Sequence, residues 1–270
     1  EFGVPNKIIN STANLDDQDN YHCFVAMVET LKNRLTDDKL DISDIGLVIV
    51  DEAHYNSFTK IFKFFDESFI LGVTATPLSS NIKLPMYENY KELYVGETIE
   101  HLIENHYLAS ANMYSYNVGL TSLEVGANGD YTVKSSEDLY TNVDMLSKLV
   151  SAYEETSKGK KTLIFNNGIH TSIQVFHAFK RAGYPVAHLD NTNTKSEREL
   201  ILKWFHKTPN AIITSVSILT TGFDEPTIEA IILNRATKSL TLYYQMIRRG
   251  SRVLNNKNTF EVIDLGNNFH

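Results

Sequence analysis

The sequence predicts an α/β protein with two domains, each built on a mainly parallel sheet. Three observations lead to this fold class. The chain has 270 residues, which exceeds one ordinary domain. Short apolar runs alternate with segments of helical periodicity. A stretch rich in glycine and asparagine interrupts this alternation near the middle. We therefore expect a first domain over residues 1–117, a linker or hairpin over 118–136, and a second domain over 137–270.

The first half contains apolar runs that are typical of strands. Residues 45–50 form a continuous apolar run, which predicts a strand buried on both faces of a parallel sheet. Residues 69–73 predict the next strand, after a short helix over 58–65. An earlier strand is expected over 24–28 and a helix over 29–35.

The second half continues the same alternation. Apolar residues at helical spacing over 139–153 predict an amphipathic helix. Thr194 and Glu197 form a capping-box sequence that begins another helix, and Trp204 on its apolar face is expected in the core. The expected strands of this half are residues 162–165, 211–214, 230–233 and 260–263.

Composition narrows the class of protein. No apolar run approaches the ~20 residues needed to cross a bilayer, and the N-terminus lacks a signal-peptide pattern, so we expect a cytoplasmic protein without a membrane partner. The single cysteine, Cys23, cannot form an internal disulfide and is expected to be a small buried hydrophobe. The formal net charge is −8, and acidic residues predominate over residues 1–117, whereas the two signs nearly balance over 118–270. Charge alone does not indicate a nucleic-acid partner.

A pair of carboxylates marks the first candidate site. Asp51 and Glu52 directly follow the apolar run that ends at Val50, and ligands of parallel α/β sheets bind beyond the carboxyl ends of the strands. Two adjacent carboxylates can divide the work of hydrolysis, because one holds a magnesium ion while the other activates a water. The alternative is a solvated acidic loop, as most such pairs are.

The residues around this pair carry a family resemblance. Residues 48–54, V-I-V-D-E-A-H, resemble motif II of the superfamily 2 DEAD/DEAH-box helicases. The resemblance implies that Asp51 is a magnesium ligand, that Glu52 activates water, and that His54 links motif II to motif VI through hydrogen bonds.

Further segments follow in the order of that family. Residues 72–77 (G-V-T-A-T-P) resemble motif III, residues 161–170 motif IV, residues 220–226 (T-T-G-F-D-E-P) motif V, and residues 245–252 (Q-M-I-R-R-G-S-R) motif VI. The residues that this resemblance implies for nucleic-acid contact are Thr74, Thr76, Asn166, Gly168, Thr220 and Thr221.

Motifs V and VI also imply a set of nucleotide contacts. Gly222 and Asp224 would approach the nucleotide, whereas Arg249 and Arg252 would reach the γ-phosphate as arginine fingers, with Gln245 nearby. Arginine suits this work because a planar, permanently charged guanidinium pairs bidentately with phosphate oxygens. The alternative is a basic helix end that balances the helix dipole.

The sequence departs from the family's pattern at two places. Arg248 stands where these enzymes usually have glycine. No Gly-x-x-x-x-Gly-Lys-Thr/Ser loop occurs, and Gly159-Lys160-Lys161-Thr162 lacks the first glycine and precedes a strand. We therefore expect a fragment that lacks the Walker A loop and hydrolyses ATP negligibly by itself.

The resemblance implies two RecA-like domains, the first incomplete, and an activity that uses ATP and Mg²⁺. The His at the fourth position of motif II and the G-F-D-E-P form of motif V resemble the DNA repair and restriction-type branch, so DNA is expected in preference to RNA. Three alternatives stay open: an RNA-dependent ATPase, an ATP-inert nucleic-acid-binding module, and a structural remnant without activity.

Overall fold

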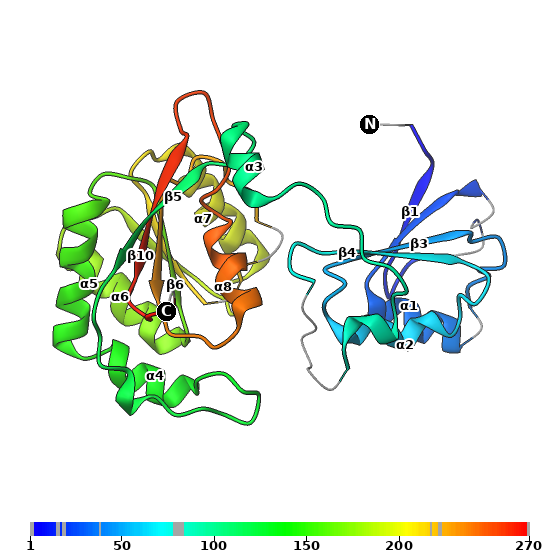
Figure 1. The fold of residues 1–270 in the computed structure, drawn as a ribbon, viewed down its shortest axis with the longest axis horizontal. Coiled ribbons are helices and arrows are strands. Elements are labelled where there is room, and N and C mark those ends of the chain that lie inside the picture. The colour runs from blue at the N-terminus through cyan, green and yellow to red at the C-terminus, as the bar shows by residue number, and fades with distance from the viewer. Residues whose placement is uncertain are drawn as a thin grey trace. The chain divides into compact units, whose positions relative to one another are not determined.

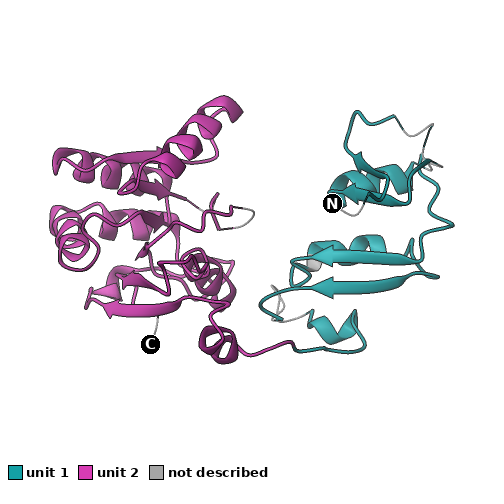
Figure 2. Cartoon of the chain, turned by 90° about the horizontal axis from the view of Figure 1, so that it is seen from above, with its two compact units in different colours: residues 1–95 teal, residues 96–270 magenta. Residues whose placement is uncertain are grey.

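The fold was analysed in a computed structural model of the chain. It describes residues 3–14, 17, 20–37, 39–77, 84–216, 218–220 and 223–268. The chain divides into two compact units, unit 1 over residues 1–95 and unit 2 over residues 96–270 (Figures 1 and 2). Both are built from helices and parallel strands, so the predicted fold class is confirmed.

Unit 1 consists of two pairs of parallel strands and short helices. β1 pairs with β2, and β3 pairs with β4. Its elements in chain order are β1 (Asn6–Ile9), β2 (Cys23–Ala26), α1 (Val28–Thr36), β3 (Leu47–Asp51), the 3₁₀ turn η2 (Asn56–Phe58), α2 (Thr59–Phe62), β4 (Phe69–Val73) and the 3₁₀ turn η3 (Met86–Glu88).

The strands of unit 1 bury one face. Their core side contributes to an apolar cluster with the helices. On the other side Ile49 is 62% exposed and Phe69 is 82% exposed. The prediction that the strand at residues 45–50 is buried on both faces is therefore wrong, because burial alternates along β3. Cys23, predicted to be buried, is exposed at the start of β2.

Unit 2 is built around one six-stranded sheet. All its strands are parallel, in the order β5-β10-β9-β6-β8-β7. Its elements in chain order are α3 (Ile99–Glu104), β5 (Ser110–Ser115), the 3₁₀ turn η4 (Leu120–Ser122), α4 (Val133–Tyr140), α5 (Val143–Thr156), β6 (Thr162–Asn166), α6 (Ile169–Arg181), β7 (Val186–Leu189), α7 (Lys195–Lys207), β8 (Ile212–Ser215), β9 (Ala230–Asn234), α8 (Leu240–Ile247) and β10 (Thr259–Asp264).

Helices cover both faces of this sheet (Figure 1). Successive strand residues point to opposite faces, so Ile164 joins the apolar cluster under α5 and α6, whereas Phe165 joins the cluster under α7 and α8. Trp204 packs against the second cluster, as predicted. The capping box at Thr194 and Glu197 is also confirmed at the start of α7.

The boundary between the units lies earlier than the sequence suggested. β5 pairs in parallel with β10, so residues 110–115 complete the sheet of unit 2. The expected first domain of 1–117 is therefore too long by the segment after residue 95. The sequence S-A-N-M-Y-S of β5 lacks a continuous apolar run, which is why periodicity did not identify it.

The segment at residues 118–136 is part of unit 2 instead of a linker. Val125 and Tyr131 form an antiparallel bridge around the Asn128-Gly129 turn, which confirms the hairpin. Gly129 has φ of 82°, a left-handed conformation that glycine adopts without steric cost. After the hairpin, α4 begins at Val133.

Candidate functional site

Motifs II and III lie side by side at the carboxyl ends of β3 and β4. The two strands are parallel and Asp51 is opposite Val73, so the chain leaves both strands at the same edge. The amide of Ala53 donates to the carbonyl of Val73 at 3.0 Å. His54 is fully buried, and its Nδ1 lies 2.9 Å from the hydroxyl of Thr74. The structure therefore joins motif II to motif III through His54. The implied link from His54 to motif VI stays a prediction.

Glu52 has an unusual backbone conformation. Its φ is 51°, in the left-handed region that a residue with a side chain seldom adopts. Its amide donates to Oδ1 of Asp51 at 2.9 Å, and its Oε2 lies 3.5 Å from Nδ1 of His54. Such a conformation costs on the order of 1 kcal/mol or more and is found preferentially at functional sites.

The threonines of motif III are engaged within the motif. The hydroxyl of Thr74 accepts a hydrogen bond from the amide of Thr76 at 3.1 Å, in addition to its contact with His54. Thr76 is buried. The structure thus places both residues beside motif II, while their implied contact with nucleic acid stays a prediction.

Gly72 allows motif II and motif III to approach. A Cβ atom at Gly72 would lie 2.6 Å from the ring of Tyr90 and 2.8 Å from Cβ of Ala53. Tyr90 was not identified from the sequence, because nothing near residue 90 resembles a motif. Any larger residue at position 72 would push motif II away from β4.

The carboxylate at the end of β3 fits a magnesium ion bound together with a nucleotide. Asp51 is exposed, and within the described ranges no group of three or more His, Cys, Asp or Glu could hold a metal by itself. Magnesium commonly binds through one or two carboxylates together with phosphate oxygens and water. Asp51 is therefore suited to be such a ligand.

In unit 2, motif IV ends in a buried network of amides and hydroxyls. Asn166, at the end of β6, donates to the hydroxyl of Thr214 at 2.8 Å and to the carbonyl of Ser215 at 3.2 Å. Its own oxygen accepts from Asn234 at 2.8 Å. Asn166 is fully buried. Its side chain therefore connects the ends of β6, β8 and β9 instead of lying at the surface, where nucleic acid was expected to contact it.

The same network continues to the edge strand β7. The hydroxyl of Ser172 lies 2.9 Å from Thr214 Oγ1 and 2.9 Å from Nδ1 of His188, whose Nε2 lies 3.0 Å from Asp190. Burial acts to raise the pKa of Asp190, but hydrogen bonds from Thr192 and His188 outweigh it and hold that pKa below its ordinary value. The order Ser-His-Asp is that of hydrolytic triads. Ser172 is fully buried, however, so the arrangement serves the fold.

The N-terminus of α6 is covered by α4. Gly168 is its N-cap residue, and a Cβ atom there would lie 2.4 Å from Glu137 Oε1 and 2.9 Å from Val133. Asn167 donates to the hydroxyl of Ser136 at 2.8 Å. The implied contact of Gly168 with nucleic acid stays a prediction, and Glu137 places a carboxylate beside Gly168.

Motifs V and VI are tied together by cations. Arg249 donates from Nε to the carbonyl of Thr220 at 3.1 Å, and its terminal nitrogens donate to the carbonyls of Thr220 and Phe223. Nε of Arg252 lies 3.2 Å from Oδ1 of Asp224, and this pair is exposed. The structure therefore brings four predicted residues of the two motifs together.

The other predicted residues of these motifs differ in their surroundings. Thr221 and Gly222 lie outside the described residues. Gln245, on α8, is buried, and its Nε2 has no hydrogen-bond partner among the residues that the structure describes. Arg248, the departure from the family pattern, is the half-buried C-cap residue of α8. Its carbonyl accepts from the hydroxyl of Ser251 at 2.9 Å.

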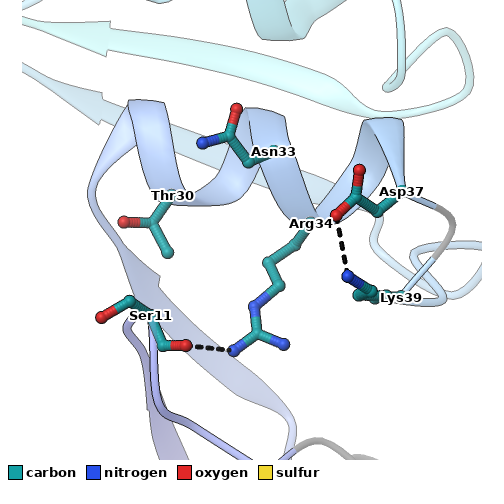
Figure 3. A pocket seen from close by; sticks show the side chains of 6 residues that line it. All are labelled: Ser11, Thr30, Asn33, Arg34, Asp37 and Lys39. Atoms are coloured by element: carbon teal, nitrogen blue, oxygen red, sulfur yellow. Dashed lines mark hydrogen bonds and ion pairs between the residues drawn. The ribbon is translucent and has the colours of Figure 1, made fainter.

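A pocket lies beside α1 in unit 1 (Figure 3). One terminal nitrogen of Arg34 donates to the carbonyls of Asn10, Ser11 and Ala13 at 3.0 to 3.1 Å, so this guanidinium braces the loop after β1. The residues that line the pocket are Ser11, Thr30, Asn33, Arg34, Asp37 and Lys39.

Within the described part of the chain, no helix is both long and apolar enough to span a bilayer.

Two family models match the chain. Residues 141–253 match the helicase conserved C-terminal domain, and residues 2–79 match the family described as type III restriction enzyme, res subunit. The chain is 30% identical to a 51.5 kDa protein of a Lactococcus phage (isolate 7-9), over 83% of this chain and 50% of that protein. It is 28% identical to a Saccharomyces cerevisiae protein named as an ATP-dependent helicase, IRC3, over 89% of this chain and 36% of that protein.

A solved structure shows the same fold. It is a fragment described as an HsdR subunit of a type I restriction enzyme from Vibrio vulnificus YJ016, with a TM-score of 0.76 and 20% identity, covering 97% of this chain and 50% of that one. The chain belongs to the superfamily 2 helicases. This helicase chain spans half or less of the length of the two curated relatives described above.

In this superfamily 2 helicase chain, motifs II and III belong to unit 1 and motifs IV, V and VI to unit 2. Hydrogen-bond contacts connect the motifs within each unit. His54 joins motif II to motif III, and Arg249 joins motif VI to motif V.

Proposed function

We propose that this chain is part of an ATP-dependent DNA helicase or translocase that couples ATP hydrolysis to movement along DNA. The observation that carries the proposal is the junction of motifs II and III. There the Asp51-Glu52 pair follows one strand, and His54 reaches Thr74 after the neighbouring strand at 2.9 Å. Membership of the helicase superfamily supports ATP as the nucleotide.

The residues of unit 1 would perform the hydrolytic step. Magnesium bound with ATP supplies positive charge that offsets the charge on the phosphates. Asp51 would hold that ion through its exposed carboxylate. Glu52 would orient the attacking water and accept its proton, a task that needs an ionised carboxylate close to the reacting phosphate. His54 would then transmit a movement of the Glu52 side chain to Thr74, because His54 lies within 3.5 Å of both side chains.

The residues of unit 2 would bind the phosphates and the nucleic acid. Arg252 is exposed and paired with Asp224, and it would stabilise negative charge on the γ-phosphate. Arg249 and Gln245 belong to the same motif VI segment and are proposed to assist it. Guanidinium groups suit this role because they remain charged and pair bidentately with phosphate. Thr220, in motif V, is proposed to face the nucleic-acid strand.

Two observations support DNA in preference to RNA. The description of the family that matches residues 2–79 names a restriction enzyme subunit, and restriction enzymes act on DNA. Motif II also has His54 at the fourth position of D-E-A-H, as the DNA repair and restriction-type branch does. A cytoplasmic location for the activity is part of the same proposal.

The test is phosphate release by the whole gene product with Mg²⁺-ATP and duplex DNA, single-stranded DNA or RNA. We expect Glu52→Gln to reduce nucleic-acid-stimulated release by on the order of 100-fold or more, the size of a general-base contribution. Glu67→Gln is the matched control, because Glu67 is an exposed carboxylate in the same unit. If the Glu52→Gln protein releases phosphate at an unchanged rate, the assignment of Glu52 as the residue that activates water is refuted. If RNA alone stimulates phosphate release, the protein moves along RNA and not along DNA.

We also propose that the 270 residues alone do not hydrolyse ATP, since they contain no Gly-x-x-x-x-Gly-Lys-Thr/Ser sequence to hold the β- and γ-phosphates. This observation favours a second function for the isolated chain, which is salt-dependent binding of nucleic acid without turnover. Fluorescence anisotropy with a labelled oligonucleotide at several salt concentrations measures the binding. Phosphate release by the pure 270-residue chain at the rate of the whole protein would contradict the proposal.

A further inference from the structure

A buried lysine lies between motifs V and VI. Lys257 ends a tight turn in which it is paired with Leu254, immediately before β10. Only 7% of its surface is exposed. Its Nζ donates to the carbonyls of Pro226 at 3.1 Å, Gly250 at 2.7 Å and Arg252 at 2.7 Å. An ammonium group has three donors, so these three bonds account for all of them.

The three acceptors belong to the two motifs. Pro226 is the last residue of the motif V segment, whereas Gly250 and Arg252 form the turn that ends motif VI. Phe260 of β10 packs closely against the same turn, since a Cβ atom at Gly250 would lie 2.1 Å from that ring. The turn that ends motif VI thus contacts both Lys257 and β10.

We infer that Lys257 is a positioning residue, which fixes the backbone of motif VI against motif V and so sets where Arg249 and Arg252 present their guanidinium groups. The inference rests on the proposed function for the role of those arginines. The contacts of Lys257 itself do not depend on that function. Its donors are all used by carbonyl groups, so it is not placed to bind a phosphate.

A lysine in this place differs from the usual surface lysine. Burying an ammonium group is costly unless its donors are satisfied. Burial lowers the pKa of Lys257 to about 8, although the carboxylates of Glu229 and Glu225 oppose the change. The ring of Phe260 lies 6.0 Å from Nζ, and Arg252 contacts Nζ through its backbone carbonyl.

Amide hydrogen exchange on the 270-residue chain tests the inference, because it requires neither ATP nor an active enzyme. The reporters are the amides of Gly250, Ser251 and Leu254, which are hydrogen bonded within this turn region. Lys257→Met removes the donors while keeping a long side chain, and Lys257→Arg restores a cation with donors. Lys160→Met is the matched control, since Lys160 forms an ion pair with Glu261 at 2.6 Å in the same unit.

We expect Lys257→Met to accelerate exchange at the reporter amides about tenfold or more, as local opening becomes easier. Exchange in β6 and β9 should stay unchanged. Lys257→Arg should restore most of the protection, and Lys160→Met should leave the reporters as they are. Equal acceleration throughout unit 2, or no acceleration at the reporters, would overturn the inference.

Two further measurements keep the test decisive. If Lys257→Met does not fold, the wild-type chain is compared at about pH 7 and about pH 9.5, after correction for intrinsic exchange rates. Opening of the turn returns Lys257 to water and to its ordinary pKa, so the open state binds more protons than the closed state in this range, and the reporters should gain protection selectively at the higher pH; unchanged protection would overturn the inference. In the whole gene product, Lys257→Met should lower kcat for ATP with little change in KM. If the wild-type protein hydrolyses no ATP, the proposed function fails, whereas the exchange result still decides the role of Lys257.

Discussion

Replacing the buried ammonium group of Lys257 should change how the free energy of unfolding depends on pH. In the folded protein the pKa of Lys257 is lowered to about 8 by burial, from an ordinary value of 10.5. The unfolded chain therefore binds more protons than the folded chain between these two values. Stability due to this group is fully present above pH 10.5, and it is lost as the pH falls through about 8.

The size of the effect follows from the two pKa values. A difference between 10.5 and about 8 corresponds to about 3 kcal/mol over the whole window, at 1.36 kcal/mol per pH unit. Between about pH 7 and about pH 9.5, the same pKa values give a gain of about 2 kcal/mol in the wild-type protein. The Lys257→Met variant lacks this gain, so the difference in unfolding free energy between the two proteins should change by that amount.

Urea unfolding at a series of pH values measures this difference. Trp204 is the single tryptophan and packs against the core of unit 2, so its fluorescence reports the unfolding of the unit that contains Lys257. Comparison with Lys257→Met cancels the titration of the tyrosines and of other lysines. A difference that stays constant from about pH 7 to about pH 9.5 would show that Lys257 titrates like a solvated lysine and would refute the reasoning.

The same urea unfolding assay measures the effect of three other substitutions on the free energy of unfolding of unit 2. Gly250→Ala places a methyl group 2.1 Å from the ring of Phe260 and should destabilise the unit by about 1–3 kcal/mol. Thr194→Ala removes the acceptor of the Glu197 amide at the start of α7 and should cost about 1 kcal/mol, whereas Thr194→Ser should cost much less. Leu149→Ala, in the fully buried part of α5, should cost about 3 kcal/mol.

Local signals in the sequence predicted much of the fold. The strand at residues 69–73 was predicted with its observed bounds, because an apolar run between polar turns is a local pattern. The capping box at Thr194 was equally clear, since its two partners are three residues apart. β5 could not be found in this way, because it is identified by its partner β10, far along the chain, and not by its own composition.

In the candidate site, too, motifs identified some residues, whereas others are recognised only from contacts between segments that are far apart in the sequence. The motif sequences singled out Asp51, Glu52 and the arginines, and the roles of these residues stay predictions. Residues 72–77 were assigned to motif III by their resemblance and by their spacing from motif II. The burial of Asn166 was not predictable, because only the sheet order shows that the ends of β8 and β9 flank β6. Lys257 also gave no signal, since its acceptors are backbone carbonyls, which have no sequence signature.

The structure separates two arginines to which the sequence assigned one role. Arg249 donates to the carbonyls of Thr220 and Phe223 in a partly buried position, so its side chain already holds motif V in place. Arg252 makes an exposed ion pair with Asp224, and such pairs contribute about 0–1 kcal/mol. A phosphate could therefore displace Asp224 from Arg252 at little cost, whereas binding to Arg249 would require its carbonyl bonds to break. Arg249→Ala should lower the stability of unit 2 by about 1–3 kcal/mol, whereas Arg252→Ala should leave it within about 0.5 kcal/mol and lower only nucleotide-dependent activity. Equal loss of stability in the two variants would show that the contacts of Arg249 with motif V do not hold the motif in solution.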